Sequence, residues 1–180
     1  MHFASAQDES ASVRTGKTDA EVFGLLYDRY VQRLYHYCYH RTNSVHDAED
    51  LTSQTFLAAL EAFPQYQRDG HFAAWLFTIA RNKVVDYYRR TPKAPVDESM
   101  LPAFHSDLAG ETENSQEEGV LLRAIRALAE DEQELIRLRY VADLSFVEIA
   151  RALRKSEGAT KKMLYRLLAR LKGQLEAGHE

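Results

Sequence analysis

Cysteine is nearly absent from this sequence, because Cys38 is the only one in 180 residues. A single cysteine excludes an internal disulfide and the thiolate clusters that bind structural zinc, and it is typical of a reducing compartment. Long apolar runs are absent too: none approaches the roughly 18 residues that a membrane helix needs, and residues 1–17 contain no signal-peptide core. We therefore expect a cytoplasmic protein without membrane insertion.

Motifs of enzymes and metal sites are also missing. The eight glycines form no GxGxxG loop, and there is no HExxH, CxxC or paired-carboxylate arrangement. His36 and His40 are one helical turn apart beside Cys38, so they could share a cation with His46 as a distant third ligand. Packed or surface histidines are the commoner outcome, and we predict no catalytic residue, no metal site and no cofactor.

The charges that are present are segregated along the chain. The net charge is −4, which argues against a uniformly basic coat. Residues 151–172, however, contain eight Lys or Arg and one acid, whereas residues 97–118 contain seven acids and no Lys or Arg. This pattern indicates a local DNA-facing surface near the C-terminus, next to an acidic connector.

Apolar residues recur at helical spacing, and no alternating strand pattern occurs, so we predict an all-α fold. Capping patterns at residues 18–21, 44–47, 131–134 and 145–148 and at Ser156 predict helix starts, and Pro64 ends one helix near Phe63. The predicted organisation has four parts: a disordered N-terminus (1–17), a helical domain (18–90), a flexible acidic linker (91–115) and a four-helix helix-turn-helix unit (116–176).

Residues 71–90 form the most informative predicted helix. Aromatic side chains alternate there with cations, which is the combination that stacks exposed bases and neutralises phosphates. A core helix with a solvated end would explain the helix equally well by itself.

The second half has the pattern of a helix-turn-helix motif, with a short helix, a tight turn and a basic second helix. The second helix would present Lys161, Lys162, Tyr165 and Arg166 on its outer face. Its first turn could approach base edges, while Lys155 and Arg170 meet phosphate. A surface helix with a solvated basic side is the alternative, but eight cations against one acid favour DNA.

Three segments of the chain carry a resemblance to two domains of bacterial sigma factors. The segments VHDAEDLTSQTFLAALEAF and FAAWLFTIARNKVVDYYRR resemble the sigma-factor domain that binds core RNA polymerase and melts the promoter. The segment ALAEDEQELIRLRYVADLSFVEIARALRKSEGATKKMLYRLLARL resembles the sigma-factor domain that binds the minus-thirty-five element. Because only a linker separates the two, the chain resembles the small extracytoplasmic-function (ECF) group.

The resemblance implies three sets of site residues and three partners: polymerase core, promoter DNA and an anti-sigma factor. Contacts to the clamp coiled coil of the largest core subunits fall to Asp47, Asp50, Leu51, Gln54 and Phe56. Contacts to minus-ten DNA fall to Tyr66, Arg68, His71, Phe72, Trp75, Arg81, Asn82 and Lys83. Contacts to minus-thirty-five DNA fall to Arg139, Lys155, Lys161, Lys162, Tyr165 and Arg166.

The sequence departs from the family pattern in the helix-turn-helix. Arg154 and Lys155 stand where a Gly and an aliphatic residue are usual, Thr160 replaces a branched aliphatic residue, and Met163 replaces an Arg. A stand-alone helix-turn-helix regulator would explain the second half equally well. It would not explain an acid-rich helix beside an aromatic-basic one in the first half.

Overall fold

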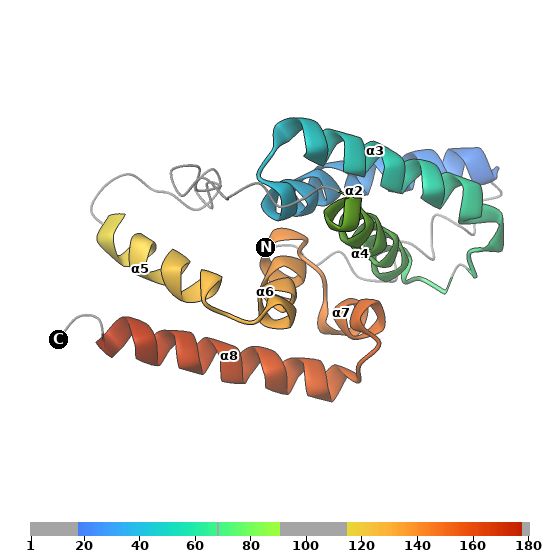
Figure 1. The fold of residues 1–180 in the computed structure, drawn as a ribbon. Coiled ribbons are helices and arrows are strands. Elements are labelled where there is room, and N and C mark those ends of the chain that lie inside the picture. Colours follow the sequence, from blue (N-terminus) through green and yellow to red (C-terminus); the bar gives the residue numbers. More distant parts are fainter. Residues whose placement is uncertain (1–17, 68, 91–114, 178–180) are drawn as a thin grey trace.

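The computed structural model describes residues 18–67, 69–90 and 115–177 (Figure 1). Every regular element among them is helical, as predicted. The elements are α2 (Asp19–Thr42), α3 (Val45–Ala62), the 3-10 turn η1 (Phe63–Gln65), α4 (Phe72–Arg90), α5 (Ser115–Arg126), α6 (Glu130–Ile136), the π-helical turn η2 (Arg137–Val141), α7 (Phe146–Leu153) and α8 (Glu157–Ala177). The predicted N-terminal segment 1–17 and nearly all of the predicted linker lie outside the described residues.

The predicted caps begin most of these helices. Before α2, the Thr18 N–H donates to the Glu21 carboxylate at 2.8 Å, and the Thr18 hydroxyl accepts from the Glu21 N–H. Ser145 and Glu148 form the same reciprocal pair before α7. Ser44 and Ser156 accept hydrogen bonds from N–H groups in the first turns of α3 and α8. These local hydrogen bonds satisfy helix N–H groups that have no partner inside the helix.

The cap predicted at residues 131–134 is wrong. Helix α6 begins at Glu130, and Ala129 occupies the cap position. The Ala129 N–H donates to the Glu132 carboxylate at 3.2 Å, so an acid in the first turn of the helix replaces a side-chain cap at its start. The earlier start places Glu134 in the second turn, where it is buried.

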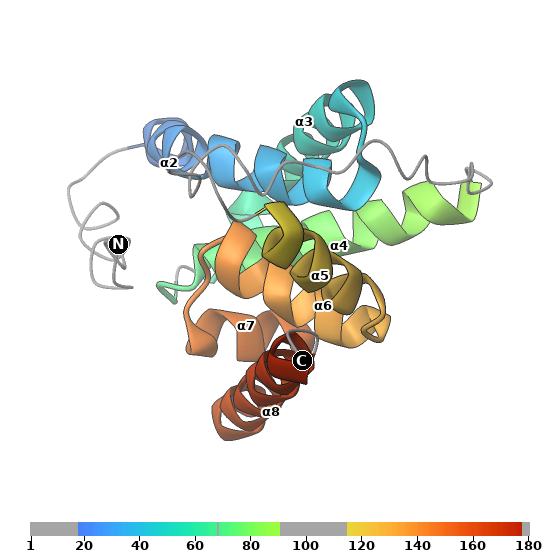
Figure 2. The ribbon, with the colours of Figure 1, turned by 90° about the vertical axis from the view of Figure 1, so that its left-hand side faces the viewer.

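The helices form two groups that lie against each other (Figures 1 and 2). One group contains α2, α3 and α4, and the other contains α6, η2, α7 and α8, with α5 along α8. Helix α4 packs against α7, and α2 packs against η2. The first and second halves of the chain therefore contact each other directly.

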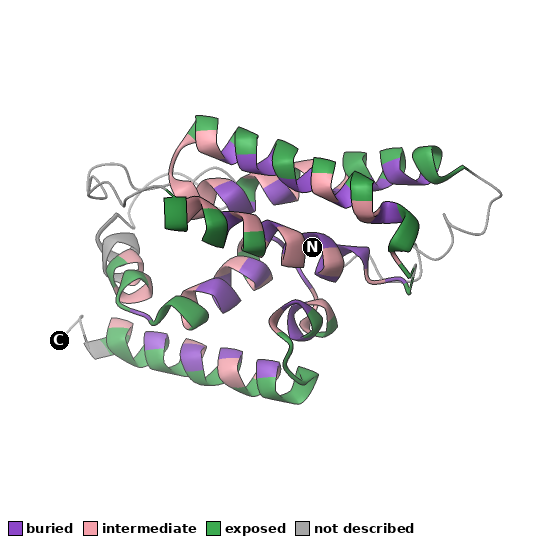
Figure 3. Ribbon diagram, turned by 45° about the vertical axis from the view of Figure 1, so that its right-hand side comes forward, coloured by how far each residue is buried: buried purple, intermediate pink, exposed green. Residues whose placement is uncertain are grey.

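Both halves contribute to the larger of the two hydrophobic clusters among the described residues, and the buried faces of the helices turn inward (Figure 3). Leu34, Phe77 and Val84 from the first half are fully buried there. Leu138 and Ile149 from the second half belong to the same cluster and are also fully buried. None of the described helices combines the length and hydropathy that a membrane span requires.

Candidate nucleic-acid interface

The loop before α4 and the start of that helix form an aromatic platform. The rings of Tyr66 and Trp75 stack with centroids 4.8 Å apart, and both side chains are half-buried. Phe72 is 1% exposed and packs edge-on against Tyr66, so it supports the platform from below. The His71 N–H donates to the Tyr66 hydroxyl at 3.1 Å, which fixes the loop to the helix. Arg68 lies outside the described residues.

The three polar residues expected on α4 have different surroundings. Asn82 is exposed, and Lys83 is half-buried. The Arg81 guanidinium is occupied, because it donates to the Glu134 carboxylate at 3.1 Å and to the Ala152 carbonyl at 3.2 Å. Of these three residues, Arg81 is therefore the one whose side chain is bound by hydrogen bonds to the second half of the chain.

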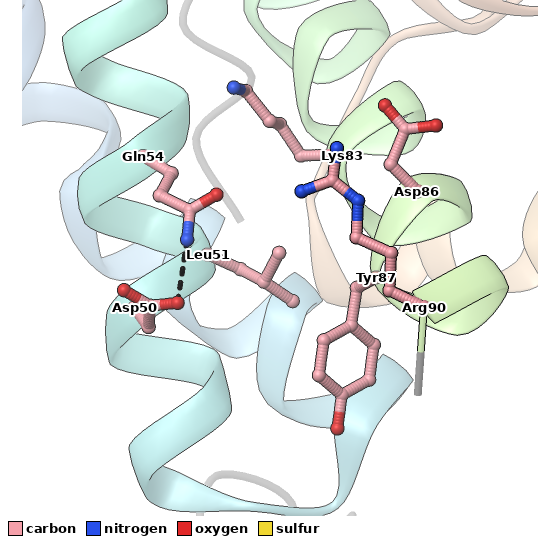
Figure 4. Close-up of a pocket in the computed structure, with 7 residues that line it drawn as sticks. All are labelled: Asp50, Leu51, Gln54, Lys83, Asp86, Tyr87 and Arg90. Atoms are coloured by element: carbon pink, nitrogen blue, oxygen red, sulfur yellow. Dashed lines mark hydrogen bonds between the residues drawn. The ribbon is translucent and has the colours of Figure 1, made fainter. Parts of the chain in front are cut away.

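A groove of about 200 Å³ separates α3 from α4 (Figure 4). Asp50 and Gln54 are exposed on the α3 side, and the Gln54 amide donates to the Asp50 carboxylate at 2.6 Å. Lys83 and Arg90 line the α4 side. The structure therefore brings Lys83, expected at minus-ten DNA, next to residues expected at polymerase core.

Two residues of the expected core-binding set are buried. Leu51 is 3% exposed, and Phe56 is 5% exposed with its ring 4.6 Å from the ring of Tyr27. Phe56 supports the exposed residues of α3 from within, whereas Leu51 lines the groove between α3 and α4 (Figure 4). Asp47 is half-buried, and burial together with a hydrogen bond to the Asp47 carboxylate raises the pKa of Tyr87.

Helix α8 presents the expected basic face. Lys162, Tyr165 and Arg166 are exposed on it, as is Lys155 in the preceding turn. Lys161 is half-buried and pairs with Glu157 at 2.5 Å, one turn earlier on the same helix.

Sequence reasoning missed Phe146, which organises this face. The Arg139 guanidinium lies 4.9 Å and the Lys161 ammonium 5.6 Å from the centre of its ring, and the Tyr165 ring is 6.2 Å away. Arg139 also donates to the Leu144 carbonyl at 2.8 Å. Phe146 of α7 gathers residues from two other elements, η2 and α8, and the sequence shows only that it follows the Ser145 cap.

Two family models of known protein domains match this chain, one in its first half and one in its second half. The family model "Sigma-70 region 2" matches residues 26–93, and "Sigma-70, region 4" matches residues 118–171. The ECF RNA polymerase sigma factor ShbA of Streptomyces griseus is 31% identical over 153 residues, which cover 78% of this chain and 80% of ShbA. This chain belongs to the ECF sigma factors.

Other similarities agree with this family. The ECF sigma factor BldN of Streptomyces coelicolor is 40% identical over 164 residues, which cover 85% of this chain but 60% of BldN. The structure of the sigma factor RpoE in complex with the anti-sigma factor NepR from Bartonella quintana has the same fold, with a TM-score of 0.63 at 22% identity over 86% of this chain and 96% of that one.

In this ECF sigma factor, region 2 and region 4 meet at a buried carboxylate. Glu134 of α6 is 5% exposed and accepts a hydrogen bond from the Tyr37 hydroxyl at 2.7 Å. Arg81, Arg41 and Arg137 approach it at 3.1, 3.2 and 3.3 Å, and we call these five residues the Glu134 cluster. Burial, and next the charge of Glu134, raise the pKa of Tyr37 well above its ordinary value, so the phenol stays protonated and donates.

Further contacts between the regions flank this cluster. The Arg33 guanidinium of α2 donates to the carbonyls of Ala142 and Asp143, just after η2. Asp69, in the loop before α4, pairs with Arg151 of α7 at 2.5 Å. Sequence reasoning missed these contacts, because the residues are about 80–110 positions apart and no local pattern links them.

Proposed function

We propose that this chain is an alternative sigma factor that binds RNA polymerase core and directs promoter recognition, melting and transcription initiation. The supporting observation is that one chain carries two surfaces suited to nucleic acid, one on each region. An aromatic platform and a charged groove lie on region 2, and an exposed basic helix lies on region 4. The polymerase does the chemistry, so the chain itself is not an enzyme. Its place of action is the cytoplasm, with polymerase and chromosome.

The proposed dock for polymerase is the exposed side of α3. Asp50 and Gln54 contact the clamp coiled coil of the largest core subunits, and Asp47 flanks them. Phe56 acts indirectly, because it is buried and keeps α3 in place, and Leu51 lines the groove beside Asp50 and Gln54. Exposed acids on a packed helix give a charged and therefore specific dock.

The proposed minus-ten site is the Tyr66–Trp75 platform, with Lys83, Asn82 and a released Arg81 along the melted strand. Opening DNA costs about 1.4 kcal/mol per base-pair step on average. Stacking one base on an aromatic side chain returns about 1–3 kcal/mol. One platform can therefore capture a base of a small bubble, whereas the polymerase must sustain the rest.

The proposed minus-thirty-five site is the exposed face of α8. Lys162, Tyr165 and Arg166 reach the major groove, while Lys155 meets phosphate at the start of the helix. Arg139 and Lys161 are held against the ring of Phe146, so they approach the duplex in fixed positions.

An anti-sigma factor is the proposed protein regulator. The support is that the similar sigma factor RpoE was solved in complex with the anti-sigma factor NepR. Such a partner would mask one or both DNA-binding regions of this chain.

The docking assignment is tested with Asp50→Lys, which reverses the charge of an exposed residue on α3. We expect core binding to be abolished and the helical content to be unchanged, measured by affinity for purified core polymerase and by circular dichroism. Glu61→Lys, an exposed acid near the end of the same helix, is the matched control and should bind as wild type. Unchanged core affinity of Asp50→Lys would reject the assignment.

A further inference from the structure

We propose that region 4 competes with minus-ten DNA for the same residues of region 2, and that the Glu134 cluster holds the free chain in this closed state. The inference rests on the proposed function and gives its minus-ten surface a regulation within the chain. In the closed state, region 4 takes the place that the melted strand must occupy.

Glu134 lies at the contact between the two regions. This carboxylate belongs to region 4, but Tyr37, Arg41 and Arg81 of region 2 supply three of its four polar partners. A carboxylate that is 5% exposed needs such partners, because burying an unpaired charge is very unfavourable. In a separated region 4 the same carboxylate would be hydrated. The cluster is therefore built for the contact between the regions and not for region 4 alone.

Region 4 also contacts both parts of the proposed minus-ten site. Arg151 of α7 pairs with Asp69, in the loop that carries the aromatic platform. The Ala152 carbonyl on the same helix accepts from Arg81. Glu134 and the Ala152 carbonyl offer Arg81 the negative and polar oxygen atoms that DNA phosphates would otherwise supply.

Promoter elements centred near minus-ten and minus-thirty-five are about 85 Å apart at 3.4 Å per base pair. Helix α8 has 21 residues and is about 32 Å long, and α7, which contacts it, packs directly on α4. The closed chain therefore cannot reach both elements at once. Residues 91–114, fully extended, can reach at most about 80 Å, so the connection is long enough for the regions to separate.

The consequence is a competition between two partners of region 2. The closed chain binds minus-ten DNA only through the fraction of molecules that are open, so its apparent affinity is reduced by that fraction. Opening releases Arg41 and Arg81 from a carboxylate and makes them available to phosphates. A partner that separates the regions, such as core polymerase, would therefore also strengthen minus-ten binding.

The substitution Glu134→Lys in the full chain tests this proposal. It places a cation among three arginines in the closed state but in water in the open state, so it should favour the open state. Asp131→Lys is the matched control, because it makes the same charge change at an exposed position of the same helix. Energy transfer between labels on Glu61→Cys and Gln174→Cys, both exposed sites, measures the separation of the regions. Cys38 is fully buried and stays unlabelled.

Binding to fluorescent single-stranded oligo(dT) measures access to the platform, because base stacking on aromatic side chains tolerates any sequence. We expect Glu134→Lys to lower energy transfer and to bind oligo(dT) about tenfold or more tightly than Asp131→Lys. Adding Arg81→Gln to Glu134→Lys should remove most of that gain. Arg151→Glu, at an exposed site that cannot disturb the core, should shift both readouts in the same direction by a smaller amount.

Two results would overturn the inference. One is a wild-type chain that already gives the low energy transfer of Glu134→Lys. The other is equal oligo(dT) affinity of Glu134→Lys and Asp131→Lys. Promoter-directed transcription by the opened chain with core polymerase tests the proposed function separately, because energy transfer reports the closed state whether or not transcription occurs.

Discussion

Tyr37→Phe removes one hydroxyl from the contact between the two regions and leaves the ring in place. The hydroxyl donates to Glu134 at 2.7 Å, and Tyr37 is 1% exposed, so water cannot replace the lost donor. A hydrogen bond to a charged group contributes about 1.5–3 kcal/mol. We expect a loss at the lower end of that range, because three guanidinium groups still surround the carboxylate.

Urea unfolding followed by circular dichroism measures this loss as a change in the free energy of unfolding. Tyr35→Phe is the control, because it removes a hydroxyl from the same helix outside the Glu134 cluster. A double-mutant cycle with Glu134→Gln should show that the two substitutions are coupled. A loss below about 0.5 kcal/mol, or additive effects of the two substitutions, would refute the role given to this hydrogen bond.

Three further predictions concern single positions. Arg154 ends α7 in the left-handed conformation with φ 54°, so Arg154→Gly should raise the free energy of unfolding by about 1 kcal/mol, and a lower value in urea unfolding would contradict this. Burial, and then the charge of His36, lower the pKa of His40 from 6.5 to about 4. The unfolded chain therefore binds this proton first, stability should fall between pH 6.5 and 4, and His40→Gln should reduce that fall in unfolding measured across pH. Phe146→Leu should weaken binding to minus-thirty-five duplex about three- to tenfold, because two cations lose their ring, whereas the salt dependence should stay the same because no charge is removed; an unchanged affinity would contradict the role of the ring.

Local sequence patterns predicted most of the helices. Thr18 with Glu21, and Ser145 with Glu148, form caps from residues three positions apart, so the sequence contains the whole interaction. The start of α6 was harder, because Ala129 caps it without a side-chain oxygen and Glu132 supplies the hydrogen bond from within the helix. Local chemistry alone does not distinguish that start from one two residues later.

The candidate site was predictable only where its residues lie close together in the sequence. Lys162 and Arg166 follow helical spacing and are exposed as expected. Helical spacing places Phe56 on the apolar side of α3, but Phe23 and Tyr27, which pack against it, come from another helix and were not predictable. The Glu134 cluster was not predictable either, since its members come from α2, α4, α6 and η2.

Promoter-directed transcription in vitro tests the central claim most directly. Core polymerase would transcribe a library of genomic promoter fragments with and without this protein, and the start sites would be mapped. We predict specific starts that occur only with the protein and that share two upstream sequence elements. The contradicting result is no specific start together with tight duplex binding by the protein alone, which would identify a stand-alone helix-turn-helix regulator.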